Sequence, residues 1–193
     1  LFQGKKAAYY TLGCKLNFSE TSTIKHSLEE ADVTTVGEKD GADIFVINTC
    51  SVTDMAEHKG RQLIRKIIHH NPQACIVVVG CYAQLRAREI LQIEGVDLVL
   101  SAADKFKVRH YLERYDEPAT DDPHSCDIFK LSAFDLAYSF GDRTRSFLKI
   151  QDGCDYFCTY CTIPFARGKS RSATIPQVLQ AARDIASKGI REV

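Results

Sequence analysis

The sequence predicts an open α/β fold with a mainly parallel sheet over residues 5–115. Short apolar segments rich in branched side chains alternate there with longer segments of helical periodicity. Two of the short segments, residues 43–48 and 75–80, are almost entirely apolar, as expected for strands that are buried on both faces. Such regular alternation of strand and helix is typical of proteins in which helices cover a parallel sheet.

Local signals set the expected boundaries of these elements. Ile24, Leu28 and Ala31 recur at helical spacing. Ser19 is the expected N-cap of their helix, with Glu20 near its positive end. The dipeptide Asn71–Pro72 ends the second helix. We expect strands at residues 7–12, 33–36, 43–48, 75–80 and 96–100, and helices at residues 19–31, 53–70, 84–93 and 103–115.

The rest of the chain has a different character. Its first stretch is acidic, contains two prolines and lacks periodicity, and its later aromatic residues are candidates to dock on a neighbouring domain. A strand at 145–151, a helix at 175–187 and a second strand from 190 would be the beginning of an α/β barrel. The expected division is residues 1–4 as the scar of a cleaved tag, 5–115 as the α/β domain, 116–145 as a linker, and 146–193 as the start of a truncated barrel.

Composition narrows the class of protein. The 193 residues contain 25 Lys and Arg against 25 Asp and Glu, so the chain as a whole lacks the basic footprint of a nucleic-acid-binding domain. It contains no apolar run long enough for a membrane span and no export signal. Its eight cysteines are therefore expected to be reduced thiols that bind metal or do chemistry in the cytoplasm, with no membrane partner.

Three of these cysteines are closely spaced in the segment GCDYFCTYC at 153–161. Cys154, Cys158 and Cys161 can reach one small centre if the backbone forms a compact loop. A structural zinc site requires a fourth ligand, and no Cys or His follows Cys161. A [4Fe–4S] cluster usually takes four thiolates, so three would leave one iron open. The spacing favours a reactive iron–sulfur site, with zinc as the alternative.

A second set of three cysteines follows predicted strands. Cys14, Cys50 and Cys81 each lie just beyond the carboxyl end of a strand. In a parallel sheet these ends lie at one edge, where ligands bind, so the three thiols are expected to converge. The alternative is three unrelated small core residues, which is how we interpret Cys75 at the start of its strand.

With both sets in place, the chain resembles a known family. It is similar to the methylthiotransferases, radical S-adenosylmethionine (SAM) enzymes with a second iron–sulfur cluster in an N-terminal domain. The resemblance implies two [4Fe–4S] clusters and SAM as cofactors. It is carried by TLGCKLNFSET at 11–21, INTCSVTDMAEHK at 47–59, VVVGCYAQ at 77–84, and FLKIQDGCDYFCTYCTIPFARGKSRS at 147–172.

The resemblance also implies roles for individual residues. Cys14, Cys50 and Cys81 would hold the auxiliary cluster, and Cys154, Cys158 and Cys161 the SAM cluster. Tyr160 would lie near the SAM adenine. The basic residues Arg167, Lys169 and Arg171 follow the loop and are candidates to bind the SAM carboxylate or a phosphate, Arg167 above all.

The form GCKLN around Cys14 is closest to the branch of the family that acts on threonylcarbamoyladenosine. That branch transfers a methylthio group to C2 of N6-threonylcarbamoyladenosine at position 37 of tRNA. Its expected partners are tRNA and an electron donor such as flavodoxin or ferredoxin. The other branches act on N6-isopentenyladenosine 37 of tRNA or on a ribosomal-protein aspartate, and both stay open as alternatives.

A function of another class is a two-cluster electron-transfer protein. Three-cysteine sites argue against it, because an electron carrier gains nothing from an open iron. Cys126, in the expected linker, has no predicted role, and the basic face of the helix at 53–70 is expected to be solvated. Since most of a barrel is missing, we do not expect these 193 residues alone to methylthiolate tRNA.

Overall fold

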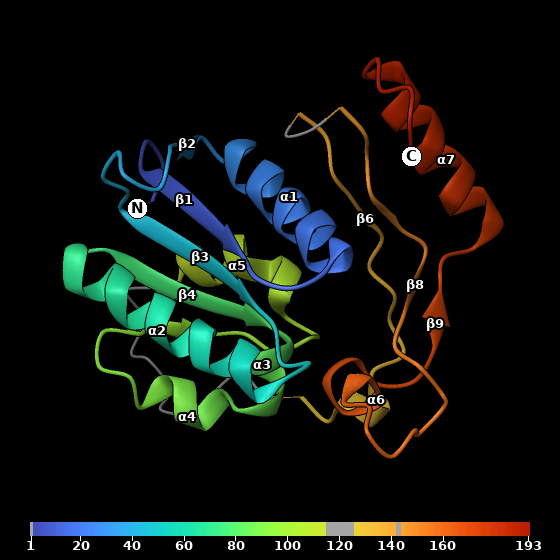
Figure 1. Ribbon diagram of the computed structural model, residues 1–193. Helices are drawn as coiled ribbons and strands as arrows, with labels where there is room; N and C mark the ends of the chain where they lie inside the picture. Colours follow the sequence, from blue (N-terminus) through green and yellow to red (C-terminus); the bar gives the residue numbers. More distant parts are fainter. Residues whose placement is uncertain (1, 115–125, 142–143) are drawn as a thin grey trace.

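A five-stranded parallel sheet organises the first part of the molecule (Figure 1). The computed structural model describes residues 2–114, 126–141 and 144–193. The strand order is β2-β1-β3-β4-β5, and every neighbouring pair is parallel, which confirms the predicted fold class. The strands are β1 Lys6–Thr11, β2 Thr34–Thr35, β3 Ile44–Thr49, β4 Cys75–Gly80 and β5 Leu98–Val99.

Helices cover both faces of this sheet. On one face, α1 (Lys15–Glu29) and α5 (Val108–Glu113) pack against Val46, Val77 and Val79. On the other face, α2 (Asp54–His70), α3 (Cys81–Leu85) and α4 (Ala87–Leu91) pack against the alternate residues Phe45, Ile47, Ile76 and Val78. Strands β3 and β4 are therefore apolar at nearly every position because they are buried on both sides.

The first helix starts earlier than predicted. α1 begins at Lys15, so the prediction that Ser19 caps it is wrong. The N-cap is Cys14, in an extended conformation, and Ser19 lies inside the helix with its hydroxyl bonded to the carbonyl oxygen of Leu16. Glu20 therefore lies inside the helix and not at its start. The sequence Lys15-Leu16-Asn17 carries no apolar periodicity that would reveal the extra turn.

The helix predicted at 84–93 is two short ones. α3 starts directly at Cys81, and Arg86, whose backbone leaves the helical region, separates it from α4. The helix predicted at 103–115 begins with a 3-10 turn at Lys105–Lys107 and continues as α5. By contrast, α2 matches its predicted bounds, with the Thr53 side chain accepting from the amide of Ala56 as its cap.

The second part of the chain forms two small antiparallel pairs. β6 (Ala137–Tyr138) pairs with β7 (Leu148–Lys149), and β8 (Gln151–Asp152) pairs with β9 (Arg171–Ser172). The single strand predicted at 145–151 is thus divided into β7 and β8. Within residues 144–193 no strand forms from 190 onwards. The start of a barrel in this region stays a prediction.

Three helical segments complete this part: the 3-10 helix η2 (Ile128–Lys130), α6 (Ile163–Arg167) and α7 (Ile175–Ser187). α7 matches its predicted bounds, with a capping box between Thr174 and Gln177 and Pro176 in its first turn. None of the described helices is both long and apolar enough to cross a membrane.

The second part of the chain runs beside α1 (Figure 1), and aromatic side chains make contacts between them. His26 stacks on Phe140 with ring centroids 3.6 Å apart, and Phe18 meets the edge of Phe147 at 5.9 Å. The predicted docking of the aromatic residues in 132–140 is therefore observed. Of the predicted linker, residues 116–125 and 142–143 lie outside the described residues. Phe2, within the predicted tag scar, is buried in the core beside α1 and α5.

Candidate metal centre at the carboxyl edge of the sheet

Three cysteines follow three neighbouring strands at one edge of the sheet. Cys50 comes directly after β3 and Cys81 directly after β4, and the last paired residues of these strands are Thr49 and Gly80. Cys14 follows β1, the strand on the other side of β3. The structure therefore brings these cysteines, here called the strand-end cysteines, to one edge, although they lie far apart in the sequence.

The glycine turn before Cys14 packs against Cys50. Gly13 has a positive φ of 104°, and a Cβ at this position would lie 2.8 Å from the Cβ of Cys50 and 2.9 Å from its Sγ. No larger residue fits there without displacing the Cys50 side chain. The turn before Cys14 is thus packed directly on the second cysteine.

Asn17 fixes the ends of two of the strands. Its amide nitrogen donates to the carbonyl oxygens of Leu12 at 2.8 Å and Thr49 at 3.0 Å. The Sγ of Cys14 lies 3.6 Å from its amide oxygen. In β3, the amide nitrogen of Asn48 donates to the carbonyl oxygen of Asn17, while its Oδ1 has no hydrogen-bond partner among the described residues. Amide side chains therefore hold the backbone that presents the cysteines.

The donor set at this edge consists of three cysteine thiols that follow neighbouring strands. No three His, Cys, Asp or Glu side chains of the described residues are placed to hold one metal ion. A zinc ion needs its ligands within about 2.0–2.3 Å of one point. A [4Fe–4S] cluster offers a separate iron to each thiolate, so its cysteines need not converge so closely. Three thiols on adjacent strands suit that larger group.

The other three cysteines, here called the loop cysteines, lie between β8 and α6. The backbone turns back on itself there: the amide of Cys154 donates to the carbonyl oxygen of Gly168, and that of Cys161 donates to Cys158. Cys158 is exposed, and Cys154 and Cys161 are half-buried. The compact loop that the spacing requires is therefore present.

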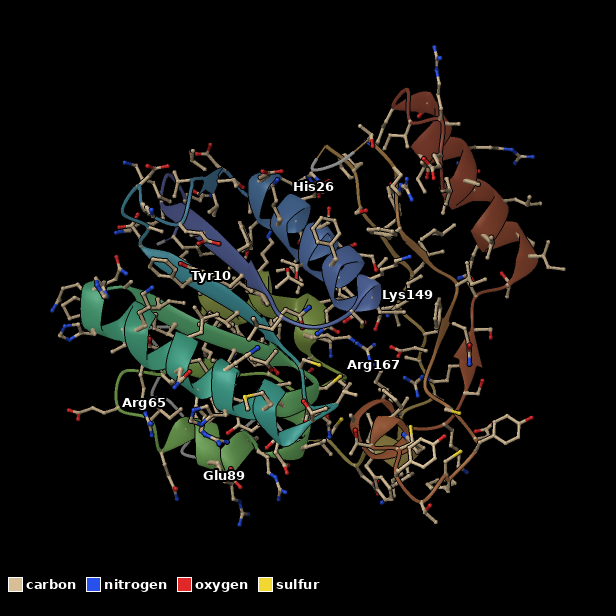
Figure 2. All side chains as sticks on the ribbon, in the orientation of Figure 1. Tyr10, His26, Arg65, Glu89, Lys149 and Arg167 are labelled. Atoms are coloured by element: carbon tan, nitrogen blue, oxygen red, sulfur yellow. The ribbon has the colours of Figure 1, made fainter. Side chains whose placement is uncertain are left out.

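The loop lies beside the strand-end cysteines. The hydroxyl of Thr162 donates to the carbonyl oxygen of Ser51 at 3.3 Å. This bond links the residue after Cys161 to the residue after Cys50. α6 packs against α3, which begins at Cys81. Figure 2 shows sulfur atoms both at the ends of the strands and in the neighbouring loop.

Aromatic residues of the loop differ in their packing. Phe157 and Phe165 contact each other and Phe129, with ring centroids 5.8–6.2 Å apart. Tyr160, predicted to lie near the SAM adenine, is 88% exposed. Its ring is therefore accessible to a planar ligand, and its predicted role stays a prediction.

A buried network of charged side chains joins α1 to the segments on either side of the loop. Its members, here called the buried ion network, have side chains no more than 6% exposed: Glu20, Lys105, Lys149, Asp152 and Arg167. Figure 2 shows Lys149 and Arg167 between α1 and the second part of the chain. Lys105 Nζ lies 2.7 Å from Glu20 Oε1, and Lys149 Nζ lies 3.1 Å from the same oxygen.

Arg167 bridges the two carboxylates of this network. One of its terminal nitrogens donates to Asp152 at 2.8 Å and to Glu20 at 3.0 Å. The other donates to the Oδ1 of Asn17 at 2.6 Å. Arg167 was predicted to bind the SAM carboxylate; in this structure its guanidinium contacts carboxylates of the protein. Arg171, at the rim, lies 4.0 Å from Asp152 and donates to the carbonyl oxygen of Ala133.

The network shifts the pKa values of its members. Burial by itself would raise the pKa of Glu20, but Lys105, Arg167 and Lys149 outweigh it and lower that pKa to about 2. Asp152 behaves alike: burial opposes ionisation, and the neighbouring cations hold its pKa well below the usual range. Burial raises the pKa of the Cys81 thiol, and the charge and hydrogen bond of Arg167 oppose that shift. Both carboxylates are thus ionised at neutral pH.

Sequence reasoning did not find this network. Its members come from α1, η1, β7, β8 and α6, and no sequence spacing relates them. One local signal exists: Lys149 stands between apolar residues in the segment Phe147–Ile150, where a charge needs a buried partner. Of the remaining cysteines, Cys75 packs against the core as predicted, and Cys126 lies 3.5 Å from the Oε1 of Gln84.

Residues 6–101, which hold the sheet and the strand-end cysteines, match the family described as "Uncharacterized protein family UPF0004". This part of the chain is therefore similar to that family.

Over nearly its whole length the chain is similar to methylthiotransferases. It is 40% identical to the threonylcarbamoyladenosine tRNA methylthiotransferase MtaB of Bacillus subtilis, over 96% of this chain and 42% of the relative. The enzyme of the same name from Aquifex aeolicus is 37% identical, over 97% of this chain and 46% of the relative. The tRNA-2-methylthio-N(6)-dimethylallyladenosine synthase of Protochlamydia amoebophila is 28% identical. The resemblance seen in the motifs is confirmed, and the chain spans less than half the length of these relatives.

Proposed function

We propose that this chain is part of a radical-SAM enzyme that transfers a methylthio group to C2 of N6-threonylcarbamoyladenosine at position 37 of tRNA. One observation carries the proposal: two groups of three cysteines lie on adjoining segments, joined through the bond between Thr162 and Ser51. Methylthiolation needs a source of sulfur and a means to activate an unreactive carbon. Two separate three-thiolate sites side by side supply a place for each.

The two groups have different tasks in this proposal. The strand-end cysteines would hold the auxiliary [4Fe–4S] cluster, and the loop cysteines would hold the cluster that binds SAM. When bound, these cofactors supply the sulfur and the radical chemistry that carbon–sulfur bond formation requires. The chain itself sets where the two centres stand relative to each other.

Residues of this chain position the cysteine thiolates and shield them from water. Gly13 and Asn17 hold the backbone of β1 and β3 so that Cys14 and Cys50 point to the same edge. Burial of Cys50 and Cys81 keeps water from two of the three thiolates. Tyr160, exposed on the loop, is available to stack on the adenine of SAM.

The substrate assignment rests on sequence similarity. The GCKLN form around Cys14 and the names of the 40% and 37% identical relatives favour threonylcarbamoyladenosine over the isopentenyl analogue. The proposed partners are tRNA, through the anticodon-loop adenosine 37, and a cytoplasmic electron donor such as flavodoxin or ferredoxin.

Nucleoside analysis tests the substrate. In cells that lack the complete gene, we expect the 2-methylthio derivative of threonylcarbamoyladenosine to disappear from tRNA digests. Threonylcarbamoyladenosine without the methylthio group should remain. Mass spectrometry of the nucleosides measures both. The gene carrying Cys50→Ala should fail to restore the product, and the gene carrying Cys75→Ala should restore it. Loss of the isopentenyl analogue instead would move the enzyme to the other tRNA branch.

Metal analysis tests the cofactors directly on this chain. After anaerobic reconstitution with iron and sulfide, we expect about four irons and four sulfides at each three-cysteine group. Replacing either group by alanines should halve both contents. One zinc per chain without sulfide would favour the zinc alternative. Addition of SAM should change the electron paramagnetic resonance spectrum of the reduced loop cluster; an unchanged spectrum would favour an electron carrier.

A further inference from the structure

The buried ion network carries more positive than negative charge. Lys105, Lys149 and Arg167 are three cations, and Glu20 and Asp152 are two anions. Arg171 at the rim adds to the positive side. A buried charge without a counter-charge is costly, so an excess of this kind calls for an anion nearby.

The strand-end cysteines lie next to this excess. Arg167 donates to the Oδ1 of Asn17 at 2.6 Å, and the Sγ of Cys14 lies 3.6 Å from the same oxygen. Arg167 is the last residue of α6, which packs against α3, the helix that begins at Cys81. The network is held in place from several directions, since its members come from α1, η1, β7, β8 and α6. The positive charge is thus fixed at the strand-end site before any ligand binds.

We propose that Arg167 is a positioning residue whose charge, with the rest of the buried ion network, balances an iron–sulfur cluster at the strand-end cysteines and raises its reduction potential. A [4Fe–4S] core with two positive charges and three thiolates carries one net negative charge, which is opposite in sign to the excess charge of the network. Reduction adds a second negative charge, so nearby cations favour the reduced form. This inference rests on the proposed function, because it takes the strand-end cysteines as cluster ligands.

The arrangement also makes one centre depend on the other part of the chain. Arg167 lies at the end of α6, directly after the loop cysteines, and reaches across to Glu20 of α1. The residue that completes the charge balance of the first site is therefore supplied by the segment that holds the second. The cluster at the strand-end cysteines would therefore reach its highest reduction potential only when the segment with the loop cysteines and α6 is packed against α1.

Two kinds of substitution test the proposal: one removes a positive charge from the network, and the other removes a negative charge. The parent for these measurements is this chain with Cys154, Cys158 and Cys161 replaced by alanine, reconstituted anaerobically with iron and sulfide so that only the strand-end site is loaded. Arg167→Gln removes a positive charge, and we expect the reduced-to-oxidised ratio at a fixed potential to fall about tenfold, equivalent to ~59 mV for a one-electron couple. Glu20→Gln removes a negative charge and should shift the ratio in the opposite direction.

Two further variants serve as controls. Arg167→Lys keeps the charge and should restore most of the ratio. Arg183→Gln removes an equal charge from an exposed position on α7 and should leave the ratio unchanged. If Arg167→Gln does not fold, Lys105→Gln removes the same charge from another element, and Asp152→Asn can replace Glu20→Gln.

Shifts of the reduced-to-oxidised ratio in opposite directions for Arg167→Gln and Glu20→Gln would support the inference. A purely structural role would instead weaken the site in both variants. Shifts in the same direction, or none, would overturn it. A parent chain that takes up no iron or sulfide would overturn the proposed function and this inference together, whereas a loaded parent with unshifted variants would overturn the inference alone.

Discussion

The strand-end cysteines and the loop cysteines reach their sites by different routes. The first group is separated by long stretches of sequence and is assembled by three neighbouring strands. The second group lies within GCDYFCTYC at 153–161 and needs only a compact turn. Two of the strand-end thiols are buried, whereas none of the three loop thiols is buried. A site assembled by the fold depends on global stability, and a site built from local sequence depends on it much less.

The core beneath the strand-end site gives the sharpest way to test this difference. Phe45 of β3 is completely buried, and Phe45→Ala should lower the free energy of unfolding by about 3–5 kcal/mol. Phe157 in the loop is 56% exposed, so Phe157→Ala should cost no more than about 0.5 kcal/mol. Urea denaturation of both variants measures the contrast. Equal losses would mean that the loop is as much a part of the cooperative core as the sheet.

The glycine before Cys81 should have the next largest effect. Gly80 has a φ of 99°, and a Cβ there would overlap the Oδ1 of Asn48 and the backbone of Thr49. We expect Gly80→Ala to destabilise the chain by about 3 kcal/mol and to reduce iron uptake at the strand-end site. Gly41→Ala is the matched control, since Gly41 also has a positive φ but open space around it, and should cost about 1 kcal/mol. Similar losses in thermal melts of both variants would contradict the steric argument.

Acid should weaken the contact between α1 and the second part of the chain, which Glu20 makes through Lys149 and Arg167. The folded-state pKa of Glu20 is lowered from 4.5 to about 2, so its ionised form stabilises the folded chain above pH 4.5. That contribution, on the order of 3 kcal/mol, should be lost progressively as the pH falls from 4.5 towards 2. Glu20→Gln should flatten this part of the pH–stability curve in urea titrations, and Glu94→Gln, in a loop away from the network, should not.

The bond between the two cysteine groups should have a small effect on stability. Thr162→Val removes the donor to the carbonyl oxygen of Ser51 and should cost about 1 kcal/mol. Thr159→Val, in the exposed part of the loop, should cost less than about 0.5 kcal/mol. Thermal melts resolve the difference, and an unchanged Thr162→Val would show that this bond does not hold the loop to the sheet.

Tyr160 should matter least for stability and most for the ligand. It is 88% exposed, so Tyr160→Ala should change the free energy of unfolding by no more than about 0.5 kcal/mol. We expect the same variant, loaded with iron and sulfide, to bind SAM about tenfold more weakly by equilibrium dialysis, with Tyr156→Ala as the exposed aromatic control. Unaltered SAM binding would remove Tyr160 from the site.

Several features were predictable because they depend on residues close in sequence. The buried strands β3 and β4, the helix α2 with its Thr53 cap, and α7 with Pro176 in its first turn all match their predicted positions. The compact turn of the loop cysteines also follows from their spacing. Each of these depends on local propensity, capping or apolar pattern, which one stretch of sequence contains in full.

Other features depended on contacts that no local pattern records. α1 begins at Lys15 because the turn at Gly13 and the bonds of Asn17 fix its first residues against β3. The strand predicted at 145–151 is divided because its two halves pair with different strands. β7 pairs with β6, which precedes it in the sequence, and β8 pairs with β9, which follows it. In both cases long-range pairing outweighed the local pattern.

The sequence alone therefore determined the class of fold, the two groups of three cysteines and the similarity to methylthiotransferases, because periodicity and motif spacing are local properties. The tertiary structure decided how the two groups meet. It placed Thr162 against Ser51, and it turned Arg167 towards Glu20 and Asn17 inside the protein. Electrostatic partners are chosen by distance in space, and the network that joins the two sites could be recognised only once the chain was folded.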